Sequence, residues 1–98
     1  MNGEPLRHTF TVTNPQGLHM RPITAFVEVA NRFKSEVFLA KEGENRINGK
    51  SPLGLLGLAA EQGTLLILEI DGPDAKEALL ALLDILSKTA EESQESGT

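Results

Sequence analysis

A histidine and an arginine lie two positions apart in the segment 17–22, Gly-Leu-His-Met-Arg-Pro. An imidazole nitrogen can act as a covalent nucleophile, and a guanidinium group is a permanent cation whose donors suit phosphate oxygens. Gly17 permits unusual backbone angles just before His19, and Pro22 is compatible with the first turn of a helix. Helix starts bind anions through their N–H groups. The segment therefore predicts an imidazole that carries a phosphoryl group at the start of a helix.

The same segment assigns roles to four residues. We predict that His19 is the nucleophile and that Arg21 stabilises the phosphoryl group. Gly17, Met20 and Arg21 are predicted to bind phosphate, because phosphoryl transfer needs cationic and N–H groups around the transferring oxygens. The alternative is that His19 only caps the helix or lies on the surface, which leaves the combination of Gly, His, Arg and Pro to coincidence. His8 has no such neighbours and is interpreted as a structural residue at a sheet edge.

The composition describes one small domain. The 98 residues are 40% hydrophobic, contain no cysteine and have phenylalanine as their only aromatic type. A chain without cysteine forms no disulfide and no thiolate metal site, which fits a reducing compartment. Its two histidines lie far apart in the sequence, so we predict no metal site. Nothing in the chain predicts a bound cofactor.

The charge is distributed unevenly along the chain. Residues 1–50 have seven Lys/Arg and five Asp/Glu, and residues 51–98 have two and nine, so +2 and −7 sum to −5. An acidic chain without Trp or Tyr is a poor nucleic-acid binder, so we expect protein partners. The longest apolar run, Leu53 to Ala60, is too short to cross a membrane, and Met1 to His8 show no signal-peptide pattern. We therefore expect a cytoplasmic protein, and a monomer.

Two apolar periodicities alternate along the chain. Strands are predicted at Leu6 to Val12, Val37 to Lys41, Arg46 to Asn48, and Thr64 to Ile70, the last apolar almost throughout and therefore central. Helical spacing predicts two long helices, one burying Ile23, Phe26, Val27, Ala30 and Phe33, the other Ala75, Ala78, Leu79, Leu82, Leu83 and Leu86. Because a residue before proline avoids the α region, the pattern argues against a helical Arg21.

A third, short helix is predicted after Ser51-Pro52, since serine is a good N-cap and proline suits the first helical position. Segment 49–51, Gly-Lys-Ser, is similar to the end of a Walker phosphate loop. However, Glu44 occupies the place of the required first glycine, and the chain has no room for a nucleotide-binding α/β domain. We therefore interpret Ser51 as an N-cap.

The element order predicts an α+β domain in which a four-stranded, mainly antiparallel sheet carries three helices on one face. We expect an N-terminal extension over residues 1–5 and the domain itself over residues 6–88. The polar segment 89–98 is expected to be a tail that frays.

Three ordered motifs resemble one family. Segment 17–22 resembles the active-site motif of HPr, the histidine-containing phosphocarrier family of the bacterial phosphotransferase system. Segment 48–54, Asn-Gly-Lys-Ser-Pro-Leu-Gly, resembles that family's regulatory-serine segment, and segment 62–64, Gln-Gly-Thr before a strand, is the third match. The resemblance covers roughly residues 5–90 and implies an open-faced β-sandwich in the order βαββαβα.

The resemblance implies a phosphoryl carrier rather than an enzyme. His19 would take a phosphoryl group on Nδ1 from phosphorylated enzyme I and pass it to an enzyme IIA domain in sugar transport. Arg21 would stabilise the transfer, and no cofactor would be bound. Ser51 would be a regulatory phosphorylation site for a bifunctional serine kinase and phosphorylase. The implied docking patch consists of Met20, Leu53 and Leu56.

Several positions depart from the family pattern. Many members have lysines on the active-site helix where this chain has Glu28 and Asn31, and small residues where it has Met20 and Ile23. Pro52, next to the serine, is also unusual for the family. These departures imply a differently charged docking surface. They leave three hypotheses: a phosphocarrier, a non-catalytic module that binds small molecules or proteins, and an HPr-like domain that acts only through its docking patch.

Overall fold

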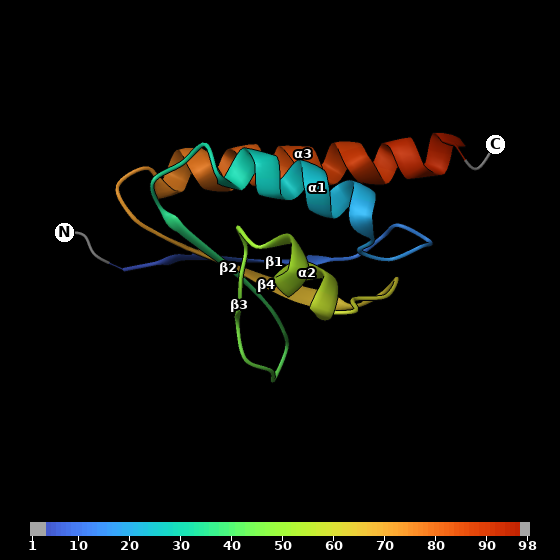
Figure 1. Cartoon of the computed structure of the whole chain (residues 1–98), viewed down its shortest axis with the longest axis horizontal. Helices are drawn as coiled ribbons and strands as arrows, with labels where there is room; N and C mark the ends of the chain where they lie inside the picture. Colours follow the sequence, from blue (N-terminus) through green and yellow to red (C-terminus); the bar gives the residue numbers. More distant parts are fainter. Residues whose placement is uncertain (1–3, 97–98) are drawn as a thin grey trace.

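The computed structural model describes residues 4–96, with side chains described up to residue 88. Its elements are β1 (Leu6–Thr11), α1 (Met20–Ala30), β2 (Glu36–Lys41), β3 (Ile47–Asn48), α2 (Pro52–Gly57), β4 (Leu65–Asp71) and α3 (Ala75–Ser96). Figure 1 shows the two long helices, α1 and α3, above the sheet and the short α2 near α1, which it contacts. The observed order is the βαββαβα order that the resemblance implied.

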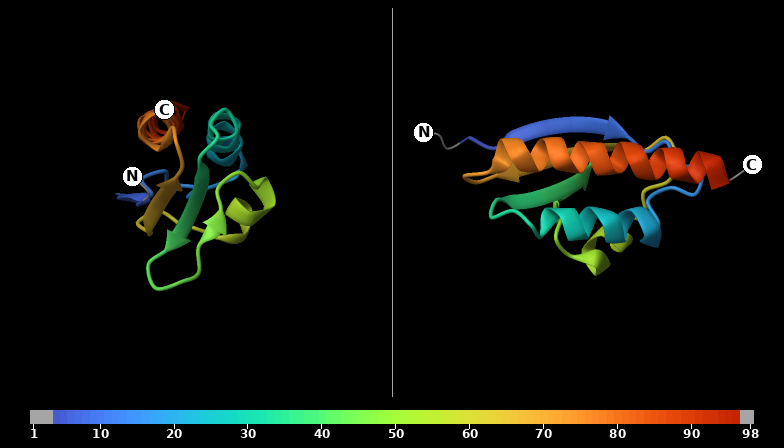
Figure 2. Two further views of the ribbon diagram at one scale, coloured as in Figure 1. Left: turned by 90° about the vertical axis from the view of Figure 1, so that its left-hand side faces the viewer. Right: turned by 90° about the horizontal axis from the view of Figure 1, so that it is seen from above.

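The four strands form one antiparallel sheet in the order β1-β4-β2-β3. β4 lies between β1 and β2, and its Leu66, Leu68 and Ile70 are fully buried, so the prediction of a central apolar strand is confirmed. α1 and α3 lie side by side over one face of this sheet, and no helix of the described residues covers the opposite face (Figure 2). The predicted α+β class is therefore confirmed.

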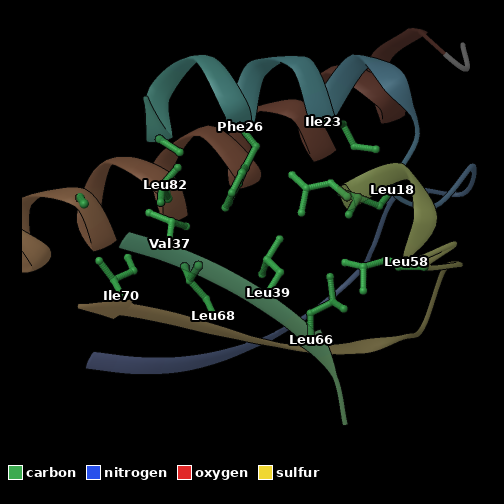
Figure 3. Close-up of a cluster of buried hydrophobic side chains, with 14 of the residues drawn as sticks. Leu18, Ile23, Phe26, Val37, Leu39, Leu58, Leu66, Leu68, Ile70 and Leu82 are labelled. Carbon is green, nitrogen blue, oxygen red and sulfur yellow. The ribbon is translucent and has the colours of Figure 1, made fainter. Parts of the chain in front are cut away.

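The core lies between the sheet and the helices. Ile23 and Phe26 from α1 and Leu82 from α3 belong to one buried cluster with the inward side chains of β2 and β4 (Figure 3). Burial of side chains of this size contributes about 1.5–3 kcal/mol each. Because Ile23 lies in the second turn of α1 and is fully buried, the core holds the start of this helix in place.

α1 begins at Met20, before the position that the pattern favoured, and ends at Ala30, before Phe33. Arg21 is helical even though Pro22 follows it, so the expectation of a non-helical Arg21 is wrong. Pro22 is tolerated because the first intrahelical bond runs from Ile23 N to His19 O (3.0 Å), and an N–H at position 22 would have had no helical acceptor. Phe33 follows the helix end at Ala30 and still packs, half-buried, against the core.

α3 continues to Ser96, through most of the segment that we expected to be a polar tail. The residues from Ser87 to Ser96 include neither glycine nor proline, so no residue there breaks the helix once the core has fixed its first turns. Fraying of residues 89–98 in solution stays a prediction. Of the expected N-terminal extension, residues 1–3 lie outside the described residues, and Glu4 and Pro5 precede β1.

The turn before β2 is fastened to the start of α3 by Asp74. Its carboxylate accepts hydrogen bonds from the Ser35 hydroxyl and from the backbone N–H groups of Lys34 and Ser35, both at 2.9 Å. The Ser35 hydroxyl and then the Lys34 N–H are the main causes that lower the pKa of Asp74 from 3.8 to about 2. The ionised carboxylate therefore joins two segments that lie 39 residues apart.

These hydrogen bonds of Asp74 predict an acid-dependent contribution to the free energy of unfolding. Because the folded-state pKa of Asp74 lies below its usual value, the contribution is fully present above pH 3.8 and is lost as the pH falls through about 2. Asp74→Asn should lower the melting temperature at neutral pH, and the difference from the wild type should shrink across that acid range. Thermal unfolding by circular dichroism tests this. Asp84→Asn, which removes an exposed carboxylate on α3, is the control and should change the melting temperature little. An effect of Asp74→Asn that does not depend on pH would contradict the proposed role of the Asp74 carboxylate.

Candidate functional site

His19 occupies the N-cap position of α1. Its backbone is extended (φ −106°, ψ −172°), and its side chain makes no capping hydrogen bond. The half-buried imidazole instead places Nδ1 3.1 Å from the carbonyl oxygen of Gly17. Because a carbonyl oxygen only accepts, Nδ1 is the donor in this contact. The interpretation of His19 as a side-chain cap is therefore wrong, although the residue does stand at the cap position.

Gly17 sets the path of the chain into His19. Its φ is +76°, in the left-handed region where glycine is favoured. A Cβ atom built at this position would lie 2.5 Å from the carbonyl oxygen of Ala60, so the close packing of two backbone segments also requires glycine. The Gly17 N–H closes a turn by donating to Asn14 O at 2.9 Å. The unusual backbone angle expected at Gly17 is confirmed.

The loop that precedes β4 supports the histidine loop. Leu18 N donates to Ala60 O at 2.8 Å, Gly63 N donates to Val12 O at 2.8 Å, and the Gln62 side-chain amide donates to Thr13 O at 3.2 Å. In the sequence, segment 62–64 stands out only through the family resemblance, and Ala60 does not stand out at all. Alanine has no polar side chain, so the contact made by its carbonyl leaves no trace in the sequence.

The start of α1 is an electropositive helix end. The ladder of intrahelical hydrogen bonds begins at Ile23 N, so the N–H groups of Met20 and Arg21 precede it, and the first turn contains no acidic residue. The positive end of the helix dipole therefore lies next to the His19 imidazole. The Arg21 side chain is exposed in the same turn. This arrangement can hold an anion beside His19.

Three large apolar side chains are exposed on the two helices near this site. Met20 of α1 is 50% exposed, and Leu53 and Leu56 of α2 are 81% and 44% exposed. The two helices contact each other, so the exposed residues come from neighbouring elements although they lie far apart in sequence. Exposed apolar side chains of this kind are typical of protein-binding surfaces.

Ser51 is the N-cap of α2, as predicted. Its Oγ accepts a hydrogen bond from Gly54 N at 3.0 Å, and Pro52 occupies the first helical position. The neighbouring Lys50 donates from Nζ to the carbonyl oxygen of Phe33 at 2.8 Å. Phe33 lies in the turn that follows α1. Because this lysine binds a backbone carbonyl and the sheet is antiparallel, segment 49–51 does not form a Walker phosphate loop.

The structure also bears on His8, on metal binding and on membrane spans. His8 lies on β1, which is an edge strand, so its predicted position at a sheet edge is confirmed. Its side chain is exposed, and a structural role for it stays a prediction. Among the described residues, no group of three His, Asp or Glu side chains is placed to hold a metal ion. No helix in the described part of the chain has the length and apolar character needed to span a bilayer.

Comparison with known proteins agrees with the geometry. Residues 6–88 match the family model described as the PTS HPr component phosphorylation site. The chain is 44% identical over 82 residues to the phosphocarrier protein HPr of Neisseria meningitidis, covering 84% of this chain and 91% of that protein. It is 43% identical over 72 residues to the HPr-like protein Crh of Halalkalibacterium halodurans, covering 74% of this chain and 84% of that protein.

The fold has close counterparts among solved structures. The histidine-containing phosphocarrier protein of a Mycoplasma superimposes with a TM-score of 0.83 at 28% sequence identity, covering 87% of this chain and 96% of that one. The HPr of Bacillus anthracis superimposes with a TM-score of 0.75 at 36% identity, covering 83% and 95%. Each coverage spans nearly the whole of the matched protein, so the similarity extends over the complete fold.

Proposed function

The chain belongs to the HPr family of the phosphotransferase system, and on that premise we propose that it carries a phosphoryl group on His19. The observation that supports this best is the position of the imidazole: half-buried, at the N-cap of α1, and not used as a cap. Among the described residues, only Nδ1 of this ring has a hydrogen bond, to the carbonyl oxygen of Gly17. The ring stands at the electropositive end of a helix, where a phosphoryl group is electrostatically favoured.

Each neighbour of His19 contributes to holding the transferred group. The N–H groups at Met20 and Arg21 and the Arg21 guanidinium supply hydrogen-bond donors and positive charge for the phosphoryl oxygens. Gly17 lets the chain turn so that His19 leads the helix, and its buried backbone keeps the loop against Ala60. Phosphoryl transfer depends mainly on such positioning and charge, so the protein needs no catalytic base of its own.

The protein is a carrier rather than an enzyme, because it is itself loaded and unloaded by others. Membership in the family implies interaction with enzymes of the phosphotransferase system such as enzyme I and enzyme IIA. We propose that Met20, Leu53 and Leu56 form the docking patch for both, that the protein acts as a monomer in the cytoplasm, and that residues 6–88 form the carrier domain. The proposal involves no cofactor, metal or nucleic acid.

Incubation with phosphoenolpyruvate and enzyme I tests the proposed function directly. One acid-labile, base-stable phosphoryl group per chain, detected by mass spectrometry, is the expected result. The alternatives, a non-catalytic module or a domain acting only through its docking patch, both predict an unchanged mass. Relatives named HPr cover more of the chain than the Crh relatives do, so the comparisons do not favour these alternatives.

Regulation through Ser51 yields a sharper prediction. Ser51→Asp keeps a good N-cap for α2 but adds a negative charge at the start of the short helix that carries the exposed Leu53 and Leu56. We expect loading by enzyme I to fall about tenfold or more, because an unmatched charge at a docking surface disfavours association. Ser51→Asn, which caps equally well without the charge, is the control and should load normally. The rates of phosphoryl loading, measured by mass spectrometry of quenched samples, test this prediction. Equal loading rates for Ser51→Asp and Ser51→Asn would contradict regulation by charge at Ser51.

A further inference from the structure

We propose that the Gly17–Leu18 peptide group is a gate on His19. Its carbonyl holds the unloaded imidazole with the proton on Nδ1, and the ring must leave this carbonyl before Nδ1 can take a phosphoryl group. The inference deepens the proposed phosphocarrier function and rests on it. It concerns which nitrogen carries the proton and what must happen before transfer.

The orientation of the gate is fixed from both sides. The described chain has no cis peptide bond, so the N–H of Leu18 and the carbonyl of Gly17 point in opposite directions. The N–H is bound to Ala60 O at 2.8 Å, and the carbonyl lies 3.1 Å from His19 Nδ1. Rotation of this peptide group would break both contacts. It would also disturb the backbone of Gly17, which packs so closely against Ala60 that an added Cβ would lie 2.5 Å from the Ala60 carbonyl oxygen.

The contact determines the position of the proton. A carbonyl oxygen accepts hydrogen bonds and never donates, so the bond requires hydrogen on Nδ1. In the neutral ring the lone pair then lies on Nε2. Nδ1 in this state has no lone pair with which to attack phosphorus. The geometry therefore describes an unloaded protein whose Nδ1 is protected from phosphorylation.

Loading on Nδ1 then needs a defined sequence of changes. Nδ1 gives its proton to water and Nε2 takes up another, so the ring stays neutral. The Nδ1–P bond forms while the bond from phosphorus to the donor atom breaks, and the donor keeps that electron pair. Nδ1 now bears phosphoryl oxygens and no hydrogen, so the Gly17 carbonyl faces electron-rich oxygens. The imidazole must turn toward the N–H groups at the start of α1.

The gate also changes the transfer equilibrium. The Nδ1–H···O bond exists only in the unloaded protein, and one neutral hydrogen bond favours the state that contains it by about fivefold. The chain of hydrogen bonds from Ala60 through the Gly17–Leu18 peptide to His19 strengthens each member. The carrier consequently releases its phosphoryl group more readily than an unconstrained imidazole would.

Nitrogen NMR of the unphosphorylated, histidine-labelled protein tests the gate without any partner. In buffer alkaline enough to keep the rings neutral, His19 should be mainly Nδ1–H, whereas the exposed His8 serves as the internal reference. A His19 ring that is mainly Nε2–H would overturn the gate. A protein that enzyme I does not phosphorylate would instead overturn the proposed function, so the two failures are distinct.

A backbone ester between Gly17 and Leu18, introduced by chemical synthesis, tests the consequence. The ester carbonyl is a weaker acceptor, and the N–H to Ala60 is removed. The Nδ1–H fraction should fall, and the equilibrium constant for phosphorylation by enzyme I should rise by up to about fivefold. An unchanged equilibrium in a folded ester protein would contradict the proposal. So would a phosphoryl group found on Nε2 with the Nδ1–H bond intact.

Discussion

Replacing His19 by alanine is expected to abolish phosphoryl acceptance while leaving the fold almost unchanged. The imidazole is the only group in segment 17–22 that can form a covalent bond to phosphorus, so the mass increase produced by enzyme I should disappear completely. The side chain contributes no capping bond and one hydrogen bond to Gly17. The loss of stability should therefore be about 1 kcal/mol or less. Mass spectrometry and chemical denaturation measure the two effects.

His8→Ala provides the matched control for this experiment. His8 is an exposed imidazole on the edge strand β1, away from any helix start, so its variant should be loaded like the wild type. Acid-labile phosphate that persists in His19→Ala and disappears in His8→Ala would reverse the assignment of the site. A collapse of stability in His19→Ala would show that the imidazole is mainly structural.

Features that depend on side-chain pattern could be predicted from the sequence. The apolar run of β4 predicted a central strand, and Ser51 followed by Pro52 predicted the start of α2, because burial and capping select particular residue types. The position of His19 at a helix start followed from the glycine and proline around it. These features are local, and each one is determined by the types of the side chains that form it.

Features that depend on long-range backbone contacts could not be predicted. Ala60 supports the histidine loop through its carbonyl oxygen, and Asp74 binds the backbone of Lys34 and Ser35. Any residue offers a carbonyl or an N–H, so the partner of such a contact leaves no compositional signal. The helical state of Arg21 is similar: a local preference against the α region is overridden by the burial of Ile23 in the next turn. The Nδ1 contact with Gly17, on which the gate depends, also belongs to this class.

If the docking patch binds enzyme I, Leu53→Glu should reduce kcat/KM for phosphoryl transfer from enzyme I by roughly 30-fold. An apolar residue that is 81% exposed in the free protein contributes little to folding, but a central apolar contact in an interface is worth about 2 kcal/mol or more. A glutamate there loses that contact and places a charge where water is excluded. The loss should fall mainly on KM, because His19 and its surroundings stay intact.

Leu80→Glu separates a docking effect from a general effect of added charge. Leu80 is also highly exposed, at 61%, but it lies on α3 rather than on α2. The same substitution there should leave transfer kinetics at the wild-type level, and both variants should unfold at the wild-type denaturant concentration. Equal losses in the two variants would mean that net charge governs the encounter with enzyme I. Normal kinetics in Leu53→Glu would place the docking surface elsewhere, because no interface centred on Leu53 and Leu56 could accept a buried, unpaired carboxylate without loss.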